Sequence, residues 1–384
     1  MRKIYLDNGS TSFPKAPGVG EAMAEFITEV GCNVGRGGYE TAYDLGAKIY
    51  ETRAMLGELF QFHKPSNVIF TPSVTYSLNY IIKGFLKPGD HVIISAMDHN
   101  AVARPCEAVK GQGVEVSVAP CGSDGALDLD AFRGLFQKNT RLVVMSHASN
   151  VCGTAQDAEA IGAICEENGV DFVLDAAQSA GVLPIDFERF RLSALCVTGH
   201  KGLLGPQGIG AMMLTDEMAD RISPVIDGGT GSASHLLSMP DFLPDKFEAG
   251  TLNLPGIIGL HAALEYVASV GTEEIRRREL ACARRFLAGL KPFDDAVRVL
   301  GVPGTERSVG TVSLDFLTAD NADVAYLLDA EYGIMTRCGL HCAPLAHQSL
   351  GTYPQGTVRF AFGHRTTMED VDDAVQAIKE ILEG

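Results

Sequence analysis

Short apolar runs alternate with helical stretches through the first half of the chain, and few folds accommodate that alternation. Seven runs have the length and composition of strands covered on both faces: residues 67–71, 91–95, 114–118, 141–146, 171–174, 195–198 and 208–214. Helical patterns separate several of them, at about 75–84, 101–112 and 158–168. Strands that are apolar on both faces are typical of a parallel sheet between two layers of helices. The pattern predicts an α/β fold with a mostly parallel, doubly wound sheet.

The rest of the chain follows a different pattern. Residues 217–250 are expected to be irregular, and a long helical pattern then starts at Pro255 and continues past Arg278. Strand and helix patterns follow at 310–316, 322–332, 357–362 and 368–382. This α+β layout predicts a second, smaller domain, in agreement with a length of 384 residues. We expect residues 16–256 to form the large domain, and residues 1–15 and 257–384 to form the small one.

Composition restricts the partners of the chain. The net charge is −17, so the surface repels phosphate backbones and anionic lipid, and we expect neither nucleic acid nor a membrane as a partner. No apolar run approaches the length of a membrane span. The nine cysteines are an odd number, and the first residues lack the apolar core of a signal peptide. These features predict a cytoplasmic protein with free thiols.

Two of the predicted strands lead into residues that can meet a ligand. The segment Thr71–Thr75 opens a helix after the first strand, where small hydroxylated residues and free N–H groups can bind a phosphate. An ordinary helix cap would have the same sequence. His99 follows the strand at 91–95, where its ring can stack on a planar ligand, move protons or cap the next helix.

Asp175 and Lys201 give sharper signals at two other strand ends. Asp175 directly follows an apolar strand, so its half-buried carboxylate needs a cation, either a protonated heterocyclic nitrogen or a buried arginine. Lys201 enters a glycine-rich loop, 198–210, after another apolar strand. A partly desolvated lysine has a lowered pKa and can form an imine with an aldehyde. Together with a phosphate cradle and a stacking His99, these residues match what pyridoxal 5'-phosphate requires.

With these motifs in place, the sequence resembles the class V aminotransferase family of fold-type I pyridoxal-phosphate enzymes, and within it the cysteine desulfurases. The last matching motif is similar to the Arg-x-Gly-x-His-Cys-Ala signature of group II, Suf-type desulfurases and of selenocysteine lyases. The match runs essentially from end to end and includes Tyr5–Asn8, Ser149–Thr154, Asp175–Gln178, Thr198–Lys201, Phe247–Thr251 and Arg337–Ala343.

The resemblance implies a role for each matching residue. Lys201 would form the imine with the cofactor, Asp175 would pair with its ring nitrogen, Gln178 would bond its phenolic oxygen, and His99 would stack on the ring. The phosphate would be held by Val74, Thr75, Thr198 and His200. Thr251 would complete the phosphate site of a neighbouring subunit, which implies a homodimer. Asn150 and Arg359 would orient the substrate, with Arg337 near its carboxylate, and Cys342 would be the nucleophile.

Two segments depart from the family pattern. The phosphate turn usually carries Gly or Asn, then Ala or Thr, then Thr-Glu, where this chain has Ser73-Val-Thr-Tyr76. The family segment Asn-x-His-Arg-Gly-x-His is here Asn33-Val-Gly-Arg-Gly-Gly-Tyr39, without either histidine. The first change leaves the backbone donors in place, and the second removes two imidazoles from the expected substrate site.

The implied reaction converts L-cysteine to L-alanine and leaves the sulfur on Cys342 as a persulfide, from which a protein acceptor can take it. A thiolate is the competent nucleophile, and Arg337 and His341 are the expected cations beside it. The alternative is a selenocysteine lyase acting on L-selenocysteine, or another lyase that breaks a Cβ–S or Cβ–Se bond. A third reading is a non-catalytic sulfur or metal carrier that uses Cys338 and Cys342. A single cluster of Cys338, His341 and Cys342, with no second Cys/His pair, is weak support for a metal site, and no metal is expected.

Overall fold

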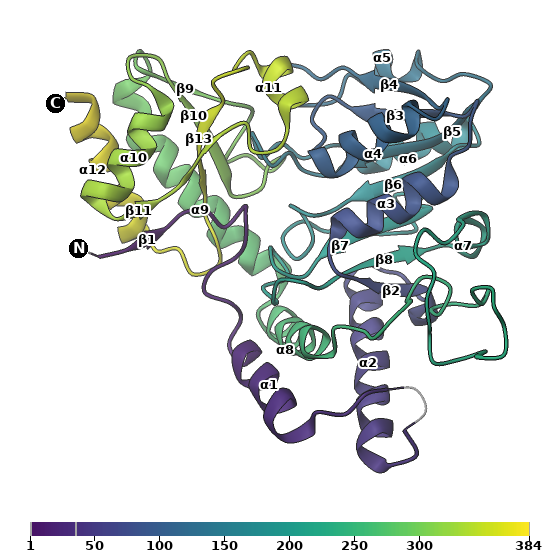
Figure 1. Cartoon of the computed structure of the whole chain (residues 1–384). Coiled ribbons are helices and arrows are strands. Elements are labelled where there is room, and N and C mark those ends of the chain that lie inside the picture. Colours follow the sequence, from purple (N-terminus) through teal and green to yellow (C-terminus); the bar gives the residue numbers. More distant parts are fainter. Residues whose placement is uncertain (1, 35–36, 384) are drawn as a thin grey trace.

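The computed structural model describes residues 2–34 and 37–383. Gly35 and Arg36, in the segment that lacks the two family histidines, lie outside the described residues. The chain is organised around a seven-stranded sheet and a four-stranded sheet, which lie on opposite sides of the molecule in Figure 1.

The larger sheet has the strand order β2-β8-β7-β6-β5-β3-β4. The neighbours from β7 to β4 in this order pair in parallel, and β8 is antiparallel to both β2 and β7. The predicted fold, with a mostly parallel doubly wound sheet, is confirmed. The strands start and end within one or two residues of the apolar runs: β2 (Val68–Thr71), β3 (His91–Ser95), β4 (Glu115–Ala119), β5 (Thr140–Ser146), β6 (Asp171–Asp175), β7 (Ala194–Thr198) and β8 (Gly210–Leu214).

Alternate residues of these strands divide between two apolar layers, because successive side chains point to opposite faces of a sheet. In β3, Ile93 packs into one layer, while Val92 and Ile94 pack into the other. Helices that pack on the face of Val92 include α3 (Val74–Phe85) and α4 (Asn100–Lys110). Helices that pack on the face of Ile93 include α2 (Glu40–Leu59), α6 (Ala158–Glu167) and α8 (Leu254–Val270).

The smaller sheet is antiparallel, with the order β12-β13-β10-β9. Its core also includes Ile4 and Leu6, because the N-terminal strand β1 pairs in parallel with β11. Both chain ends therefore lie on this side of the molecule (Figure 1). The domain division at residues 15 and 256 stays a prediction. The elements are β1 (Ile4–Tyr5), β9 (Val297–Val299), β10 (Thr311–Phe316), β11 (Ile334–Met335), β12 (Arg337–Gly339), β13 (Thr357–Ala361), α9 (Thr272–Leu290), α10 (Asn321–Tyr332) and α12 (Met368–Glu383).

The single long helix expected from Pro255 past Arg278 is two helices, so that expectation was wrong. α8 ends at Val270, and the φ of the next residue, Gly271, is +85°, in the left-handed region that favours glycine. α9 leaves at an angle of 79° to α8. Among the described residues no single helix is long and apolar enough to cross a membrane. The bent pair α8 and α9 meets that criterion only when taken together, and α8 is largely buried in the core.

The apolar pattern left several short elements unpredicted. Residues 222–253 contain no helix or strand, so the irregular region expected at 217–250 is correct except at its start, where a short helix covers residues 217–221. The remaining helices are α1 (Val19–Glu25), α5 (Leu129–Arg133), α7 (Asp216–Arg221) and α11 (Pro344–Leu350).

Candidate active site

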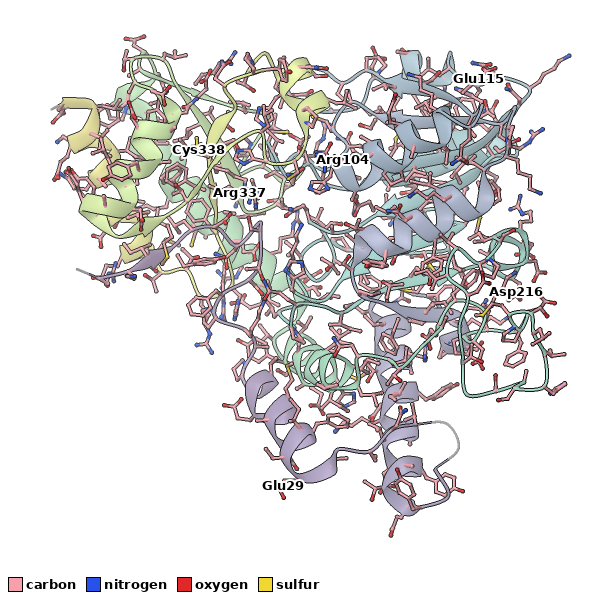
Figure 2. All side chains as sticks on the ribbon, in the orientation of Figure 1. Glu29, Arg104, Glu115, Asp216, Arg337 and Cys338 are labelled. Atoms are coloured by element: carbon pink, nitrogen blue, oxygen red, sulfur yellow. The ribbon has the colours of Figure 1, made fainter. Side chains whose placement is uncertain are left out.

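The carboxyl ends of β3, β5, β6 and β7 meet at one edge of the larger sheet, where parallel sheets bind ligands. A cavity of about 220 Å³ lies at this edge. Arg337, which Figure 2 labels beside Cys338, lines it from β12 of the smaller sheet. Eleven of the predicted site residues line the cavity: Val74, Thr75, His99, Asn150, Asp175, Gln178, Thr198, His200, Lys201, Arg337 and Arg359.

Asp175 and Lys201 both line the cavity, and each shifts the pKa of the other. Asp175 is 3% exposed and accepts a hydrogen bond from the Ala177 N–H at 2.9 Å, and no arginine pairs with it among the described residues. Burial raises the pKa of Asp175, and the nearby Lys201 opposes that rise. Burial also lowers the pKa of Lys201 to about 8, against the effect of Asp175. The site therefore has a carboxylate ready for a ligand cation and an amine that is partly uncharged near neutral pH.

One end of the cavity has several hydrogen-bonding groups without partners. Val74 and Thr75 are the first residues of α3, where helix N–H groups have no partner within the helix, and Ser73 makes no capping bond. Thr198 Oγ1 and His200 Nδ1 are buried without hydrogen-bond partners among the described residues. A phosphate fits these donors and the positive end of the helix dipole.

His99 caps α4, which was one of the roles that the sequence left open, and it also lines the cavity. Its stacking on a planar ligand stays a prediction. Its Nδ1 accepts a hydrogen bond from the Ala101 N–H at 2.9 Å. Burial lowers the pKa of His99 to about 4, with Lys201 contributing in the same direction. Since Nδ1 is an acceptor, the proton of the neutral ring is on Nε2, and the ring is held in one orientation.

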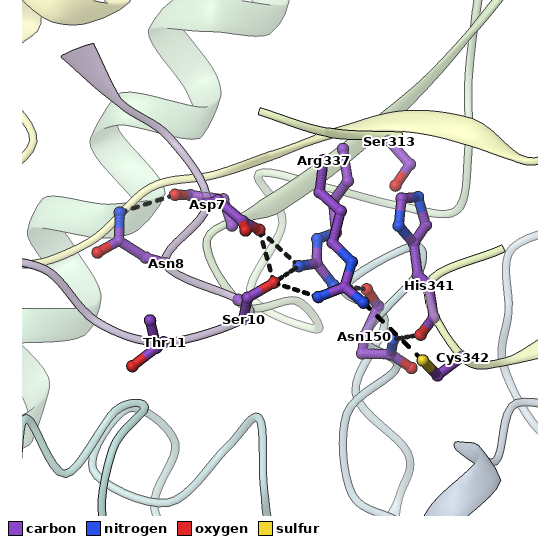
Figure 3. Close-up of polar contacts among 12 residues, drawn as sticks. Asp7, Asn8, Ser10, Thr11, Asn150, Ser313, Arg337, His341 and Cys342 are labelled. Carbon is purple, nitrogen blue, oxygen red and sulfur yellow. Dashed lines mark hydrogen bonds and ion pairs between the residues drawn. The ribbon is translucent and has the colours of Figure 1, made fainter. Parts of the chain in front are cut away.

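Two arginines, Arg337 and Arg359, form a polar wall of the cavity, and the N-terminal segment binds both. Figure 3 labels Arg337 with Asp7 and Ser10 of that segment. Arg359 is 2% exposed, and its Nη2 donates to Asp7 Oδ1 and to Ser10 Oγ, each at 2.8 Å. Arg337 Nη1 donates to the same Ser10 Oγ at 2.7 Å. Arg359 Nε is buried without a partner among the described residues. The two guanidinium groups are therefore fixed side by side, as a carboxylate-binding pair requires.

Asn150 and Gln178 complete the lining through their amides. Asn150 Nδ2 donates to the His341 carbonyl at 2.7 Å, and its Oδ1 is buried without a partner among the described residues. Gln178 Nε2 donates to the Gly9 carbonyl at 2.9 Å. Each amide thus ties a loop of the larger sheet to a segment on the far side of the cavity.

Cys342 is exposed and does not line the cavity itself, but it contacts a residue that does. Arg337 Nη2 donates to Cys342 Sγ at 3.8 Å. The expectation that His341 is a second cation beside the thiol was wrong. Burial lowers the pKa of His341 to about 2, so its ring is neutral. The Nε2 atom of that ring is hydrogen-bonded to Thr357 Oγ1 at 3.0 Å. Cys338 is half-buried on β12, and burial raises its pKa. Among the described residues, no group of three or more His, Cys, Asp or Glu side chains is placed to hold a metal.

Thr251 is not brought to this cavity. It is exposed, and it lies beside Phe70, Thr71 and Tyr76 in a separate pocket. Its predicted role in the phosphate site of a second subunit does not require it to reach the cavity of its own chain, and that role stays a prediction.

Asp7, Ser10 and Ser146 are among the residues of the site that carried no predicted role. Asp7 and Ser10 bind the arginines, and Ser146 at the end of β5 lines the cavity. The segment Tyr5–Asn8 belonged to the family match, and a carboxylate within it was the available signal. Pairing Asp7 with Arg359 requires knowing that β1 lies beside the C-terminal part, which no local pattern reveals.

The residues present fit pyridoxal phosphate. The polar atoms of Thr198 and His200, which have no partner among the described residues, could hold its phosphate, and the buried carboxylate of Asp175 could pair with its ring nitrogen. Lys201, whose pKa is lowered, could form the imine. Fold and site together define a pyridoxal-phosphate enzyme of fold type I.

Comparison with known proteins specifies the family. The family model for Aminotransferase class-V matches residues 4–374, and the chain belongs to this family, whose cofactor is pyridoxal phosphate. A probable cysteine desulfurase of Pyrococcus abyssi is 31% identical, over 99% of this chain and 94% of that protein. A probable cysteine desulfurase of Methanothermobacter thermautotrophicus is 30% identical, over 98% of this chain and 94% of that protein. The apo structure of cysteine desulfurase from Thermococcus onnurineus NA1 superposes with a TM-score of 0.91 at 30% identity, covering 100% of this chain and 95% of that one.

Proposed function

We propose that the protein is a cysteine desulfurase that converts L-cysteine to L-alanine and collects the sulfur on Cys342 as a persulfide. The observation that carries this proposal is the contact between Cys342 Sγ and Arg337, because it puts a thiol next to the arginine pair of the cavity. A cavity with Lys201 and Asp175 alone would suit many reactions of amino acids. A thiol at its carboxylate-binding side suits sulfur transfer.

The arginine pair binds and orients the substrate. Arg359 is held by Asp7 and Ser10, and its unpartnered Nε, together with the neighbouring Arg337, can receive a carboxylate. Fixing the carboxylate at this wall directs the rest of the amino acid toward Lys201. Binding energy is thereby used to orient the bond that reacts.

Lys201 is the group that moves protons. Its pKa of about 8 lets it accept the proton from the substrate Cα and return it without a large free-energy difference. Pyridoxal phosphate, when bound, supplies the electron sink that makes this proton removable. Burial raises the pKa of Asp175, and a protonated ring nitrogen of the bound cofactor would offset that rise by pairing with the Asp175 carboxylate.

Sulfur transfer is the step assigned to Cys342. Its thiolate attacks the sulfur of the bound cysteine, so that an S–S bond forms while the substrate Cβ–S bond breaks. The electron pair of the broken bond stays with the carbon fragment, which takes up a proton and leaves as alanine. Arg337 is near enough to steady the negative charge of the attacking sulfur.

Selenocysteine lyase remains the alternative activity on the same scaffold, but the relatives favour the desulfurase, since those compared here carry that name. Assignment to the Suf-type subgroup rests on the Arg337–Ala343 motif. A non-catalytic carrier is the weaker alternative, because it gives no purpose to the lowered pKa of Lys201.

A homodimer, a protein sulfur acceptor and a cytoplasmic location belong to the same proposal. The dimer is supported by large exposed apolar side chains near α2, including Ile27, Tyr43 and Tyr50. It is also supported by Thr251, which lines a separate pocket and not the cavity of its own chain. The acceptor is supported by the exposure of Cys342. The location is supported by the cysteines, all nine of which are free.

The test compares alanine and persulfide formed from L-cysteine by wild type, Cys342→Ser and Cys338→Ser. We expect Cys342→Ser to lose sulfur transfer and Cys338→Ser to retain it. Full activity in Cys342→Ser would refute the nucleophile assignment. Cofactor absorbance that persists unchanged in Lys201→Ala would refute the cofactor site, and a wild type without that absorbance would leave only the carrier.

A further inference from the structure

The turn that carries Cys342 has a backbone conformation that its residues rarely adopt. φ is +48° at His341 and +59° at Cys342, so two successive residues with side chains lie in the left-handed region. That region is unfavourable for residues with a Cβ, and such conformations persist only where the surroundings hold them. Something outside the turn must therefore hold it in this shape.

Two hydrogen bonds from the larger sheet hold it. The Asn100 N–H donates to the Cys342 carbonyl at 2.7 Å, and Asn150 Nδ2 donates to the His341 carbonyl at 2.7 Å. Both donors lie in segments that follow strands of the larger sheet, whereas the turn follows β12 of the smaller sheet. The carbonyls of the two strained residues are thus each bound by the opposite side of the site (Figure 3 shows the Asn150 contact).

The Asn150 bond also fixes which atom faces the cavity. A carbonyl oxygen can only accept, so the amide nitrogen must face His341 and Oδ1 must face away from it. Oδ1 is buried without a partner among the described residues, and Asn150 lines the cavity. While Asn150 Nδ2 is hydrogen-bonded to the turn, Asn150 can present only the acceptor Oδ1 to a ligand. A substrate carboxylate would therefore bind to Arg337 and Arg359 and not to Asn150.

We propose that the backbone N–H of Asn100 and the side-chain amide of Asn150 are positioning groups that hold Cys342 where its sulfur meets the substrate sulfur. The inference rests on the proposed function and assigns these groups a task in it. Neither group needs to touch the reacting sulfurs. Since a misplacement of about 1 Å can cost roughly 10²-fold in rate, loss of either bond slows sulfur transfer while cofactor binding and substrate entry continue.

Asn100 offers a matched pair of variants. It is the first residue of α4, where proline is tolerated because that N–H has no partner within the helix. His99 before it has φ −70° and ψ 157°, which suits a residue that precedes proline. Asn100→Pro removes the donor to Cys342, and Asn100→Ala keeps it while removing the same side chain.

The first measurement needs no turnover. Hydrogen exchange of a peptide spanning Leu340–Leu345 is followed in the holoenzyme without substrate. We expect exchange up to about tenfold faster in Asn100→Pro than in Asn100→Ala, because the net value of one hydrogen bond corresponds to about that factor in an opening equilibrium. Equal exchange in the two variants overturns the proposal. If Asn100→Pro does not fold, exchange of the same peptide is compared between Asn150→Ala and wild type. Faster exchange in Asn150→Ala is then expected, and equal exchange overturns the proposal.

The second measurement separates positioning from a general structural effect. In a single turnover with L-cysteine, the absorbance change of the bound cofactor reports substrate entry, and mass spectrometry after quenching reports persulfide on Cys342. We expect persulfide formation to be roughly 10- to 100-fold slower in Asn100→Pro than in Asn100→Ala, with the absorbance change unaltered. A parallel fall in both readouts overturns the proposal. Absence of persulfide in wild type refutes the proposed function instead, and leaves the exchange result standing.

Discussion

The lysine side and the cysteine side of the cavity are built in different ways. Lys201 and Asp175 lie at the ends of buried, fully paired strands, and their environment shifts both pKa values. Cys342 is exposed, strained at its backbone and held by a few hydrogen bonds from across the cavity. Under the proposed function, the half with Lys201 and Asp175 would prepare the amino acid, and the more weakly attached half with Cys342 would receive the sulfur.

The largest effect is expected on the half with Lys201 and Asp175, from Lys201→Ala. Because the amine both anchors the cofactor and moves the proton, we expect turnover of L-cysteine to fall by at least roughly 10³-fold. Alanine formation under saturating cofactor is the measurement, with the exposed Lys83→Ala as control. A loss below tenfold would mean that the lysine side does not carry the chemistry.

The arginine wall links the two halves and should give an intermediate effect. Asp7→Asn weakens a charge-assisted hydrogen bond to Arg359, so we expect KM for L-cysteine to rise by about tenfold, with a smaller change in kcat. Ser10→Ala should act on both arginines but more weakly, because it removes neutral acceptor contacts. Steady-state kinetics checks both. A change confined to kcat would contradict a role in binding the carboxylate.

The electrostatic link between Asp175 and Lys201 can be tested by pH. Imine formation needs the uncharged amine, so the rate of cofactor uptake by apoprotein should rise with pH and level off above about pH 8, the pKa of Lys201. Asp175 raises that pKa, so Asp175→Asn should move the midpoint to lower pH. Absorbance after mixing with pyridoxal phosphate gives the rates. A midpoint that moves to higher pH, or stays, would contradict this link.

The smallest effect is expected on the strained half, from two substitutions of the same residue. At φ +59° a Cβ is unfavourable, so Cys342→Gly should be more stable than Cys342→Ala by about 1 kcal/mol. Cys342 is exposed, so little packing is lost in either variant. Denaturant unfolding of the two holoenzymes measures the difference. Equal stability would show that the turn stores no strain.

The sequence predicted one half of the site far better than the other. Asp175 and Lys201 end apolar strands, and the rule that parallel strands meet at one edge was sufficient to bring them together. Asp7 and Arg359 are 352 positions apart, and they lie side by side because β1 pairs with β11 and Asp7 forms a bridge with Ala361 of β13. Proximity in the sequence also misled: His341 is next to Cys342, but burial makes it neutral. The bend at Gly271 was missed because the segments on both sides of it are helical, and a single glycine is tolerated within a helical pattern.

The pairing of β1 with β11 has a consequence for how the molecule is made. On a ribosome, Asp7 and Ser10 emerge long before their partners Arg337 and Arg359, because more than 300 residues separate them. The strands of the larger sheet, which lie between them in the sequence, can pair while translation continues. The segment with Asp7 and Ser10 must stay available during that time, so the arginine wall is completed after the larger sheet, and a chain terminated before Arg337 lacks it.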